Sequence, residues 1–514
     1  MAEILFGFQI AELIFLPARE SKTNMRGVTN SEENRKKCIC PSCPSYPENC
    51  RGELLYCGKG KSKCEIPVST CVCPGCPVYK ENQLSGLFFC DKEDSLLPVS
   101  LRKIRPAETD SAYEAIAQIK KIAASGESQV GAMGSLKQMP FSFKDIHFIP
   151  AQVFKIPVNA EQPVNTEVII GPSAKKPIKI SVPIMITGMS FGALSRNTKI
   201  AIALAVKEIK TAYSSGEGGI LPEDLEIARE FLIGQYATGR FGFDEKVFSN
   251  LAGIEIKFGQ GAYPGKGSFL PAEKITPEVA KVRGLKPGEP SYSPARHPDM
   301  RNPEEIKAKV DWLRKIGGGV PVGAKIGCGN VEGDIEVLVN AGVDYISMDG
   351  FGGGTGATNF YARENVGIPI VAALPRAVKK MKEMGVKKKI SLIVAGGLRT
   401  SADFTKCLAL GANAVYIGTA ALIAVNCEQY RMCHTDLCPT GVTTQLPSLT
   451  AQLDPEKGKQ RLVNFIKVST EEISNIVRIV GKNDVKDLNP DDLVSLDKDL
   501  SELVKIKWLS GKAD

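Results

Sequence analysis

Between about residues 181 and 445, short apolar runs alternate with helix-type stretches, and glycine-rich junctions join them. The helical periodicity is clear at residues 195–210 and 303–316, while the apolar runs have the length of buried strands. Strands that are each followed by a helix pair in parallel, and helices then cover both faces of the sheet. The apolar runs are residues 183–190, 252–259, 321–327, 345–350, 369–374, 391–397 and 414–420.

This alternation predicts an α/β fold, and its length suits a (β/α)8 TIM barrel at residues 181–445. An open, doubly wound sheet is the alternative, but no GxGxxG motif opens the region. The rest of the chain divides into a cysteine-rich module at 1–95, a connecting region at 96–180 with a helix near 108–125, and a helical tail at 446–514.

The fifteen cysteines are clustered: ten lie between residues 38 and 90, and three between residues 427 and 438. Nothing in the sequence indicates secretion, so clustered thiolates are interpreted as metal ligands in preference to a disulfide scaffold.

The cysteine-rich module contains an internal repeat, because CICPSCPSY at 38–46 recurs as CVCPGCPVY at 71–79, 33 residues later. A module of fewer than about sixty residues buries little apolar surface and needs additional cross-links to be stable. Bound metal would provide them. Its cysteines could hold one or two [4Fe–4S] clusters, or zinc, with disulfides as the third alternative. The candidate ligands are Cys38, Cys40, Cys43, Cys50, Cys57, Cys64, Cys71, Cys73, Cys76 and Cys90.

Two further motifs lie toward the end of the predicted barrel. Gly396-Gly397 and Gly418-Thr419 follow its last two strands, where barrels of this type bind phosphate. The triplet Cys427-x5-Cys433-x4-Cys438 suits an iron–sulfur cluster better than zinc, which prefers four ligands. The alternatives are tight strand–helix packing for the glycines and three buried thiols for the triplet.

Charge and hydropathy exclude two classes of protein. The net charge of +8 is mild for 514 residues, and no Lys/Arg block alternates with aromatics, so no nucleic-acid partner is expected. The apolar runs are shorter than the roughly 18 residues of a membrane helix. We therefore expect a cytoplasmic protein with no membrane partner.

Several motifs together resemble the FMN-binding, iron–sulfur synthase region of the glutamate synthase large subunit, in its archaeal-type form. The resemblance covers roughly residues 145–500, and CPTGVTTQ after the cysteine triplet is its most specific part. The segments are ITGMSFGALS (186–195), SSGEGG (214–219), QYATGRFG (235–242), IEIKFGQGAYPGKGSFLP (254–271), DGFGGGTGA (349–357), AGGLRTSADF (395–404), IGTAALIA (417–424) and CEQYRMCHTDLCPTGVTTQ (427–445).

The resemblance implies a role for each matching residue. Lys257, Glu217 and Lys325 would be catalytic, with Lys257 stabilising negative charge on reduced flavin. Gln260 and Arg283 would bind the 2-oxo acid. Cys427, Cys433 and Cys438 would hold a [3Fe–4S] cluster. The residues around FMN would be Met189, Ser190, Gln235, Lys257, Gly350, Gly353, Gly354, Gly396, Gly397, Gly418 and Thr419.

The resemblance also implies a reaction and its partners. FMN would transfer hydride to the imine of 2-oxoglutarate and ammonia, giving L-glutamate. Electrons would come from a ferredoxin or an NAD(P)H-oxidising flavoprotein. Nitrogen would come from glutamine through a separate glutaminase subunit, or from free ammonia or an amine. The alternatives are a related enzyme acting on another amine or oxo acid, for example forming N-methylglutamate, and a non-catalytic electron-transfer subunit.

The sequence departs from the family on the substrate side. Where the family usually reads QGAKPGEGGQLPG, this chain reads QGAYPGKGSFLPA, so Tyr263 replaces a lysine and Phe269 replaces a glutamine. A lost charge-assisted hydrogen bond costs about 1.5–3 kcal/mol, so these replacements bear on the identity of the oxo acid and not on that of the flavin. Lys266 and Arg296 are the candidates to compensate.

Overall fold

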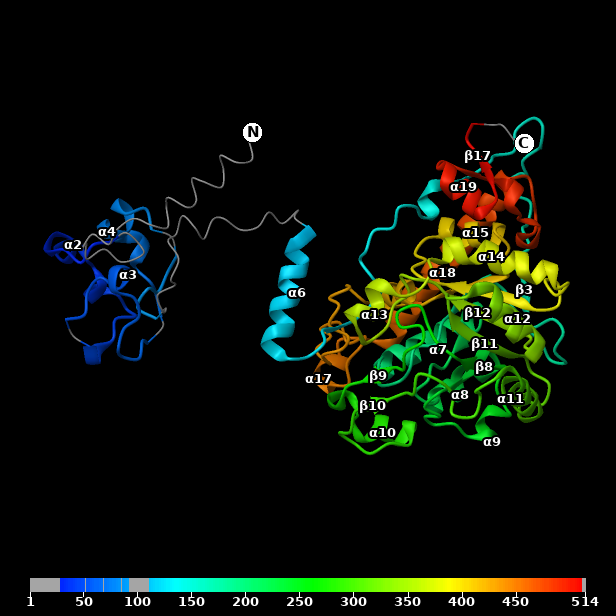
Figure 1. The fold of residues 1–514 in the computed structure, drawn as a ribbon, viewed down its shortest axis with the longest axis horizontal. Helices are drawn as coiled ribbons and strands as arrows, with labels where there is room; N and C mark the ends of the chain where they lie inside the picture. The colour runs from blue at the N-terminus through cyan, green and yellow to red at the C-terminus, as the bar shows by residue number, and fades with distance from the viewer. Residues whose placement is uncertain (1–27, 51, 68, 85, 92–110, 511–514) are drawn as a thin grey trace. The chain divides into compact units, whose positions relative to one another are not determined.

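A computed structural model describes residues 28–50, 52–67, 69–84, 86–91 and 111–510 (Figure 1). The chain forms two units, Met1–Ser125 and Gly126–Asp514. The division falls inside the predicted connecting region, after helix α6 (Ser111–Ser125), which lies where a helix was expected.

The second unit is built around a closed barrel of eight parallel strands, which confirms the predicted fold class. The strands follow chain order around the ring, and the last pairs with the first, so no edge is left open. They are β5 (Ile184–Ile186), β6 (Tyr213–Ser214), β7 (Leu232–Ala237), β8 (Gly253–Lys257), β11 (Val322–Gly327), β12 (Tyr345–Asp349), β14 (Ser391–Ala395) and β15 (Ala414–Ile417).

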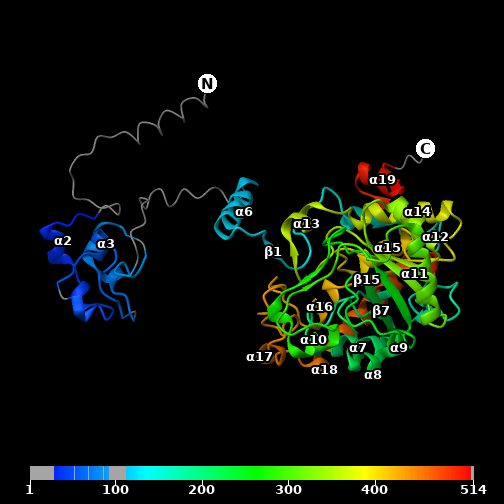
Figure 2. The ribbon, with the colours of Figure 1, turned by 60° about the horizontal axis from the view of Figure 1, so that its bottom comes forward.

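Helices surround this barrel, as Figure 2 shows for β7 and β15 with α8, α9 and α11 outside them. The predicted helices at 195–210 and 303–316 are confirmed, with Ser195 and Asn302 as their N-caps. The helices are α7 (Arg196–Ile209), α8 (Pro222–Ala228), α9 (Glu245–Phe248), α10 (Pro277–Arg283), α11 (Pro303–Ile316), α12 (Val331–Ala341), α13 (Phe360–Asn365), α14 (Ile370–Glu383), α15 (Ser401–Ala409), α16 (Thr419–Val425) and α17 (Pro447–Thr450).

One predicted strand is wrong. Residues 369–374 form the start of helix α14, and two real strands, β6 and β7, were absent from the predicted set. The first five residues of α14 are all buried, so their apolar run carries no 3.6-residue period. A short apolar run of this kind cannot be told from a buried strand by pattern alone.

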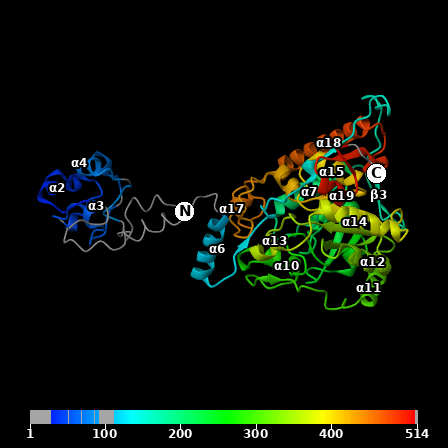
Figure 3. The same cartoon turned by 45° about the horizontal axis from the view of Figure 1, so that its top comes forward.

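The C-terminal region adds a long helix and a small sheet. Helix α18 (Pro455–Ile479) packs along α7 and α15, as Figure 3 shows. The predicted helical tail also contains strand β16 (Leu493–Ser495), which pairs with β2 (Ile146–Phe148) and β17 (Lys507–Trp508) beside helix α19 (Lys498–Val504).

A hairpin of β3 (Val168–Ile170) and β4 (Ile178–Ile180) lies against the amino ends of the barrel strands. Gly171 N donates a 3.0 Å hydrogen bond to Ser391 Oγ at the start of β14. Ile169 O accepts a bond from the same hydroxyl at 3.3 Å. Two further pairs complete the fold, namely β1 (Val130–Gly131) with β13 (Thr358–Asn359), and β9 (Phe269–Leu270) with β10 (Ser291–Tyr292).

Besides helix α6, the described part of the first unit is a cysteine-rich module of short helices: α2 (Glu32–Lys37), α3 (Tyr56–Lys59) and α4 (Pro77–Glu81). Here the structure corrects the predicted ligand set, because Cys50 and Cys64 form a disulfide. A cysteine in a disulfide has no thiolate to give to a metal. In the described parts of both units, the helices include none with a stretch long and apolar enough to cross a bilayer.

Candidate active site

A cavity of about 1260 Å³, partly open to solvent, lies at the carboxyl end of the barrel strands. Catalytic groups of this fold sit at that end. The loops after the barrel strands therefore bring together residues that are far apart in sequence. The predicted site residues that line the cavity are Met189, Ser190, Glu217, Gln235, Lys257, Gln260, Arg283, Lys325, Gly353, Gly354, Gly396, Gly397, Gly418, Thr419, Cys427 and Cys433.

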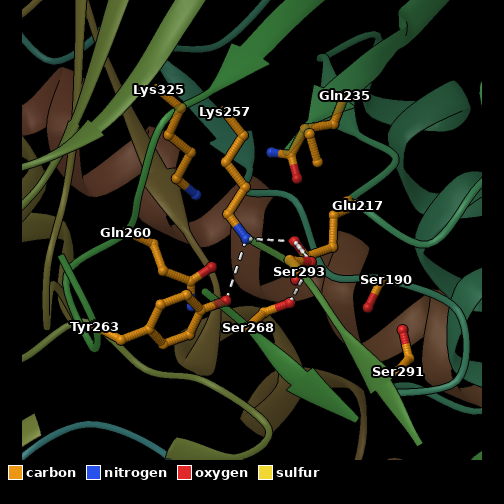
Figure 4. Close-up of polar contacts among 12 residues, drawn as sticks. Ser190, Glu217, Gln235, Lys257, Gln260, Tyr263, Ser268, Ser291, Ser293 and Lys325 are labelled. Atoms are coloured by element: carbon orange, nitrogen blue, oxygen red, sulfur yellow. Dashed lines mark hydrogen bonds and ion pairs between the residues drawn. The ribbon is translucent and has the colours of Figure 1, made fainter. Parts of the chain in front are cut away.

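Lys257, the last residue of β8, forms the centre of the site (Figure 4). Its Nζ lies 3.1 Å from Glu217 Oε2 and donates to the Tyr263 hydroxyl at 3.1 Å. Burial alone would raise the pKa of Glu217, but the charge of Lys257, a hydrogen bond from Ser268 and the charge of Arg283 together lower it. Burial raises the pKa of Tyr263 well above its usual value, with Glu217 adding to the effect, so its phenol stays protonated.

Arg283 ends helix α10 and is also buried in the cavity wall. Its Nη2 donates to Ser190 Oγ at 2.9 Å and to Phe191 O at 2.8 Å. Burial lowers the pKa of the guanidinium to about 10, and the nearby Glu217 opposes that shift. Arg283 therefore remains charged at neutral pH and orients Ser190 beside the cavity.

A second polar group lies deeper in the barrel. Glu255 is fully buried and accepts hydrogen bonds from Gln235 Nε2 at 2.8 Å, Ser347 Oγ at 2.9 Å and Ser214 Oγ at 3.2 Å. These bonds satisfy the buried carboxylate and fix the side chain of Gln235 at the cavity wall.

Lys325 projects from β11 beside this group. Its Nζ donates to Thr187 Oγ1 at 2.6 Å and lies 4.0 Å from Asp349 Oδ2. Burial raises the pKa of Asp349, and Lys325 partly opposes the shift. Lys325 and Lys257 therefore supply two buried cations within one cavity.

Glycines form a close-packed cradle at one side of the cavity. Gly396 and Gly397 have φ values of +123° and +80°, which side chains rarely adopt. A Cβ on Gly354 would lie 2.8 Å from Thr419 Oγ1, and one on Gly396 would lie 2.7 Å from Gly350 N. Gly350 is absent from the cavity lining, and its cofactor contact stays a prediction. A Cβ on Gly350 would lie 2.5 Å from Ile370 N, so its small size leaves room for the start of α14.

The cysteine triplet borders the same cavity, with Cys427 and Cys433 in its lining and Cys438 behind them. Gln429 N donates to Cys427 Sγ at 3.4 Å, and Cys438 Sγ lies 3.3 Å from Thr440 Oγ1. Burial raises the pKa of Cys433, and the neighbouring Cys438 contributes to the shift. The three cysteines thus lie in one loop next to the cavity.

Lys274 is a functional candidate that sequence reasoning missed. Its side chain is 1% exposed, and Nζ donates to Thr443 O at 2.7 Å, Cys433 O at 3.0 Å and Ala193 O at 3.2 Å. Its sequence context, LPAEKITPE, is that of a surface turn, so only the fold reveals a buried ammonium. Arg399, next to the glycine cradle, was also missed and lines the cavity.

The departures from the family pattern lie inside the cavity, but the residues expected to compensate do not. Tyr263 and Phe269 line the cavity wall, whereas Lys266 and Arg296 are absent from the lining. Arg296 is exposed. The structure therefore supplies no extra cation at the place where the family has a lysine.

His297 is a buried residue that contacts the backbone of Lys257. Its Nε2 donates to Lys257 O at 2.9 Å, and its Nδ1 lies 2.6 Å from Arg240 Nη1, so the ring is neutral with its proton on Nε2. Burial, with the charge of Arg240 adding to it, lowers the pKa of His297 to about 4.

This shift predicts a pH-dependent stability. Because the unfolded chain binds a proton at His297 near pH 6.5 and the folded chain only near pH 4, stability should fall as pH decreases through that window. The expected contribution is about 3 kcal/mol. Urea unfolding at pH 7 and pH 4.5 should show a smaller pH effect in His297→Asn; equal pH effects in both proteins would contradict the assignment.

Comparison with known proteins identifies the family. Residues 113–483, more than half of the chain, match the model described as a conserved region in glutamate synthase. Residues 38–91 match a second model, described as a protein of unknown function (DUF2769). The cysteine-rich module and the barrel therefore match separate families.

Relatives with curated names agree with the first match. The glutamate synthase large subunit-like protein of Rhizobium meliloti is 36% identical over 77% of this chain and 95% of that protein. The archaeal glutamate synthase [NADPH] of Methanocaldococcus jannaschii is 42% identical over 60% of this chain. The match spans only 61% of the latter protein's length.

Solved structures with a partial likeness to this chain include a variant of flavocytochrome b2 with sulfite bound. It is 16% identical, with a TM-score of 0.45, and the match covers 72% of this chain and 79% of that chain. A lactate oxidase of Pediococcus acidilactici is 14% identical with a TM-score of 0.46, over 71% of this chain and 89% of that chain. The family match and the curated relatives, together with the eight-stranded barrel, show that this chain belongs to the glutamate synthase family of oxidoreductases.

Proposed function

We propose that this chain reductively aminates a 2-oxo acid, with 2-oxoglutarate and ammonia giving L-glutamate as the first candidate reaction, in the cytoplasm. The observation that carries the proposal is a single cavity bordered by the glycine cradle, three buried cations and two cysteines of the triplet.

The residues present fit FMN. Gly353, Gly354, Gly396 and Gly397 would let phosphate oxygens approach the backbone, and Arg399 supplies a cation beside them. Met189 and Gln235 would lie beside the ring system. Bound FMN supplies hydride transfer, a chemistry that amino acid side chains lack.

The chain's own residues would hold charge and protons around the reacting atoms. Lys257 holds a proton at Nζ and stabilises negative charge in a buried site, where such a charge acts strongly. Glu217 and Tyr263 orient that ammonium. Lys325 provides a second ammonium from the neighbouring strand, and Gln260 and Arg283 are proposed to contact the oxo acid.

The triplet Cys427, Cys433 and Cys438 fits a [3Fe–4S] cluster, because its three sulfurs share a loop and Lys274 offsets their negative charge. Such a cluster would supply one-electron transfer. The electron donor is proposed to be a ferredoxin or an NAD(P)H-oxidising flavoprotein, and a separate glutaminase to provide ammonia. Relatives named for NADPH and for ferredoxin support this range of donors.

A second candidate is favoured by the substrate side of the cavity. Tyr263 and Phe269 replace polar residues of the family pattern. The Tyr263 hydroxyl also accepts a hydrogen bond from the Lys257 ammonium. A bulkier or less polar oxo acid, or an alkylamine in place of ammonia, would suit these side chains. Side-by-side assays with 2-oxoglutarate and apolar 2-oxo acids, each with ammonia and methylamine, distinguish the two.

Replacing Cys433 by alanine tests the route of electrons. We expect Cys433→Ala to keep bound flavin and to lose turnover driven by a one-electron donor, because the cluster lacks one of three ligands. Cys407→Ala is the matched control, since Cys407 is buried in α15 away from the cavity lining. Flavin absorbance and ferredoxin-driven turnover are measured, and unchanged turnover in Cys433→Ala would refute the scheme.

A further inference from the structure

The cysteine-rich module contains eight cysteines outside its disulfide, and all of them line one cavity of about 540 Å³. They form two sets with identical spacing, each set 33 residues from the other. The first set is Cys38, Cys40, Cys43 and Cys57, and the second is Cys71, Cys73, Cys76 and Cys90.

The two disulfide cysteines are those without a repeat partner. Cys50 corresponds to Gln83, and the position equivalent to Cys64 is Leu97. The disulfide therefore removes the two unmatched thiols and leaves two matched sets of four. Four cysteines are the ligand number of a [4Fe–4S] cluster and also of a structural zinc site.

The sequence repeat is also a structural repeat. Leu55 N donates to Cys38 Sγ at 3.3 Å, and Phe88 N donates to Cys71 Sγ at 3.2 Å. Leu55 and Phe88 both have positive φ, 55° and 52°, which non-glycine residues adopt only when the surrounding structure requires it. Each repeat thus aims a backbone N–H at its first sulfur, a contact that tunes iron–sulfur clusters.

The third cysteine of each repeat points to the other repeat. Cys43 Sγ donates to Thr70 O at 3.3 Å, and Cys76 Sγ lies 3.9 Å from Lys37 O. Thr70 and Lys37 directly precede the first cysteine of the opposite repeat. The two contacts are equivalent under the 33-residue repeat, so each repeat places its third cysteine against the other repeat.

We propose that the module binds two [4Fe–4S] clusters with exchanged ligands. One cluster takes three cysteines from the first repeat and one from the second, and the other cluster takes the reverse. The two ligand sets are Cys38, Cys40, Cys57, Cys76 and Cys71, Cys73, Cys90, Cys43.

Clusters fit the module better than zinc for two reasons. In zinc sites, both cysteines of a Cys-x2-Cys pair usually bind the same ion. In the proposed ligand sets the pairs Cys40/Cys43 and Cys73/Cys76 are divided between sites, as the contacts of Cys43 with Thr70 and of Cys76 with Lys37 suggest. The fourth cysteine of a two-cluster ferredoxin run is divided from its neighbours in the same way. Among the residues that the structure describes, no three Cys, His, Asp or Glu side chains converge on a point that a single metal ion could occupy.

Metal analysis of the full chain tests the cluster assignment. The variants Cys427→Ala and Cys433→Ala remove two ligands of the proposed cluster beside the barrel. In this background the iron content measures the cysteine-rich module alone, so the result does not depend on the proposed function. We expect about eight irons and eight acid-labile sulfides per anaerobically purified chain. Adding Cys50→Ala and Cys64→Ala should leave that count unchanged. Zinc in place of iron, or protein free of metal, would overturn the proposal.

Two matched triple variants in the same background test the exchange. Cys38→Ala/Cys40→Ala/Cys76→Ala should destroy one site and leave about four irons in an intact cluster. Cys38→Ala/Cys40→Ala/Cys43→Ala should destroy one site and damage the other, leaving fewer irons. EPR of the reduced proteins distinguishes intact from damaged clusters. The reverse order, or equal iron in both variants, would overturn the exchange.

Discussion

Replacing Lys257 by methionine is expected to lower turnover at least about 100-fold, the scale seen when one preorganised electrostatic contact is removed. Methionine keeps most of the side-chain volume but cannot hold a proton or stabilise negative charge. It also leaves Glu217 buried without its cation, which costs about 3–5 kcal/mol of folding free energy. Steady-state kinetics and urea unfolding measure the two effects.

A double variant separates the two roles of Lys257. In Lys257→Met/Glu217→Gln neither buried charge remains, so most of the lost stability should return while turnover stays low. Recovery of turnover together with stability would show that Lys257 serves folding alone, and would contradict its catalytic role.

Replacing Lys274 by methionine is expected to destabilise the second unit by about 3–5 kcal/mol. The change leaves the carbonyls of Ala193, Cys433 and Thr443 without their donor, and Asp436 loses the ammonium 3.9 Å away. Both tryptophans of the chain, Trp312 and Trp508, lie in this unit, so tryptophan fluorescence during urea unfolding reports on it.

Lys281→Met is the matched control, because Lys281 is exposed on the adjacent helix α10. Its effect should stay within about 0.5 kcal/mol. The double variant Lys274→Met/Asp436→Asn should recover only part of the loss, since three carbonyls still lack a donor. Equal stability of Lys274→Met and Lys281→Met would show that water replaces the ammonium without cost.

The barrel could be predicted because its strands are buried on both faces. β8, β12 and β14 are buried at every position, and such strands appear in sequence as continuous apolar runs. The same property caused the error at residues 369–374, where a helix is buried all around its first turns. Strand β6 was missed because it has only two residues, Tyr213 and Ser214.

The site residues could be predicted where they belong to recognisable sequence motifs. They could not be predicted where only the fold brings them to the site. The resemblance identified Lys257, Glu217 and Arg283, which the structure brings together in one cavity. Sequence alone could not reveal that Lys274 is buried, since this depends on loops 81 and 169 residues away. In the cysteine-rich module the sequence marks Cys50 and Cys64 as the two cysteines without a repeat counterpart, but only the structure shows that they form a disulfide.

The hairpin β3–β4 has a consequence for how molecules would reach the cavity. Hydrogen bonds of Gly171 and Ile169 to Ser391 hold this hairpin at the amino end of β14, whereas the cavity lies at the carboxyl end of the strands. Side chains fill the interior of barrels of this type. The proposed keto acid, nitrogen source and product would therefore share the opening at the carboxyl end, and each product would have to leave before the next substrates enter.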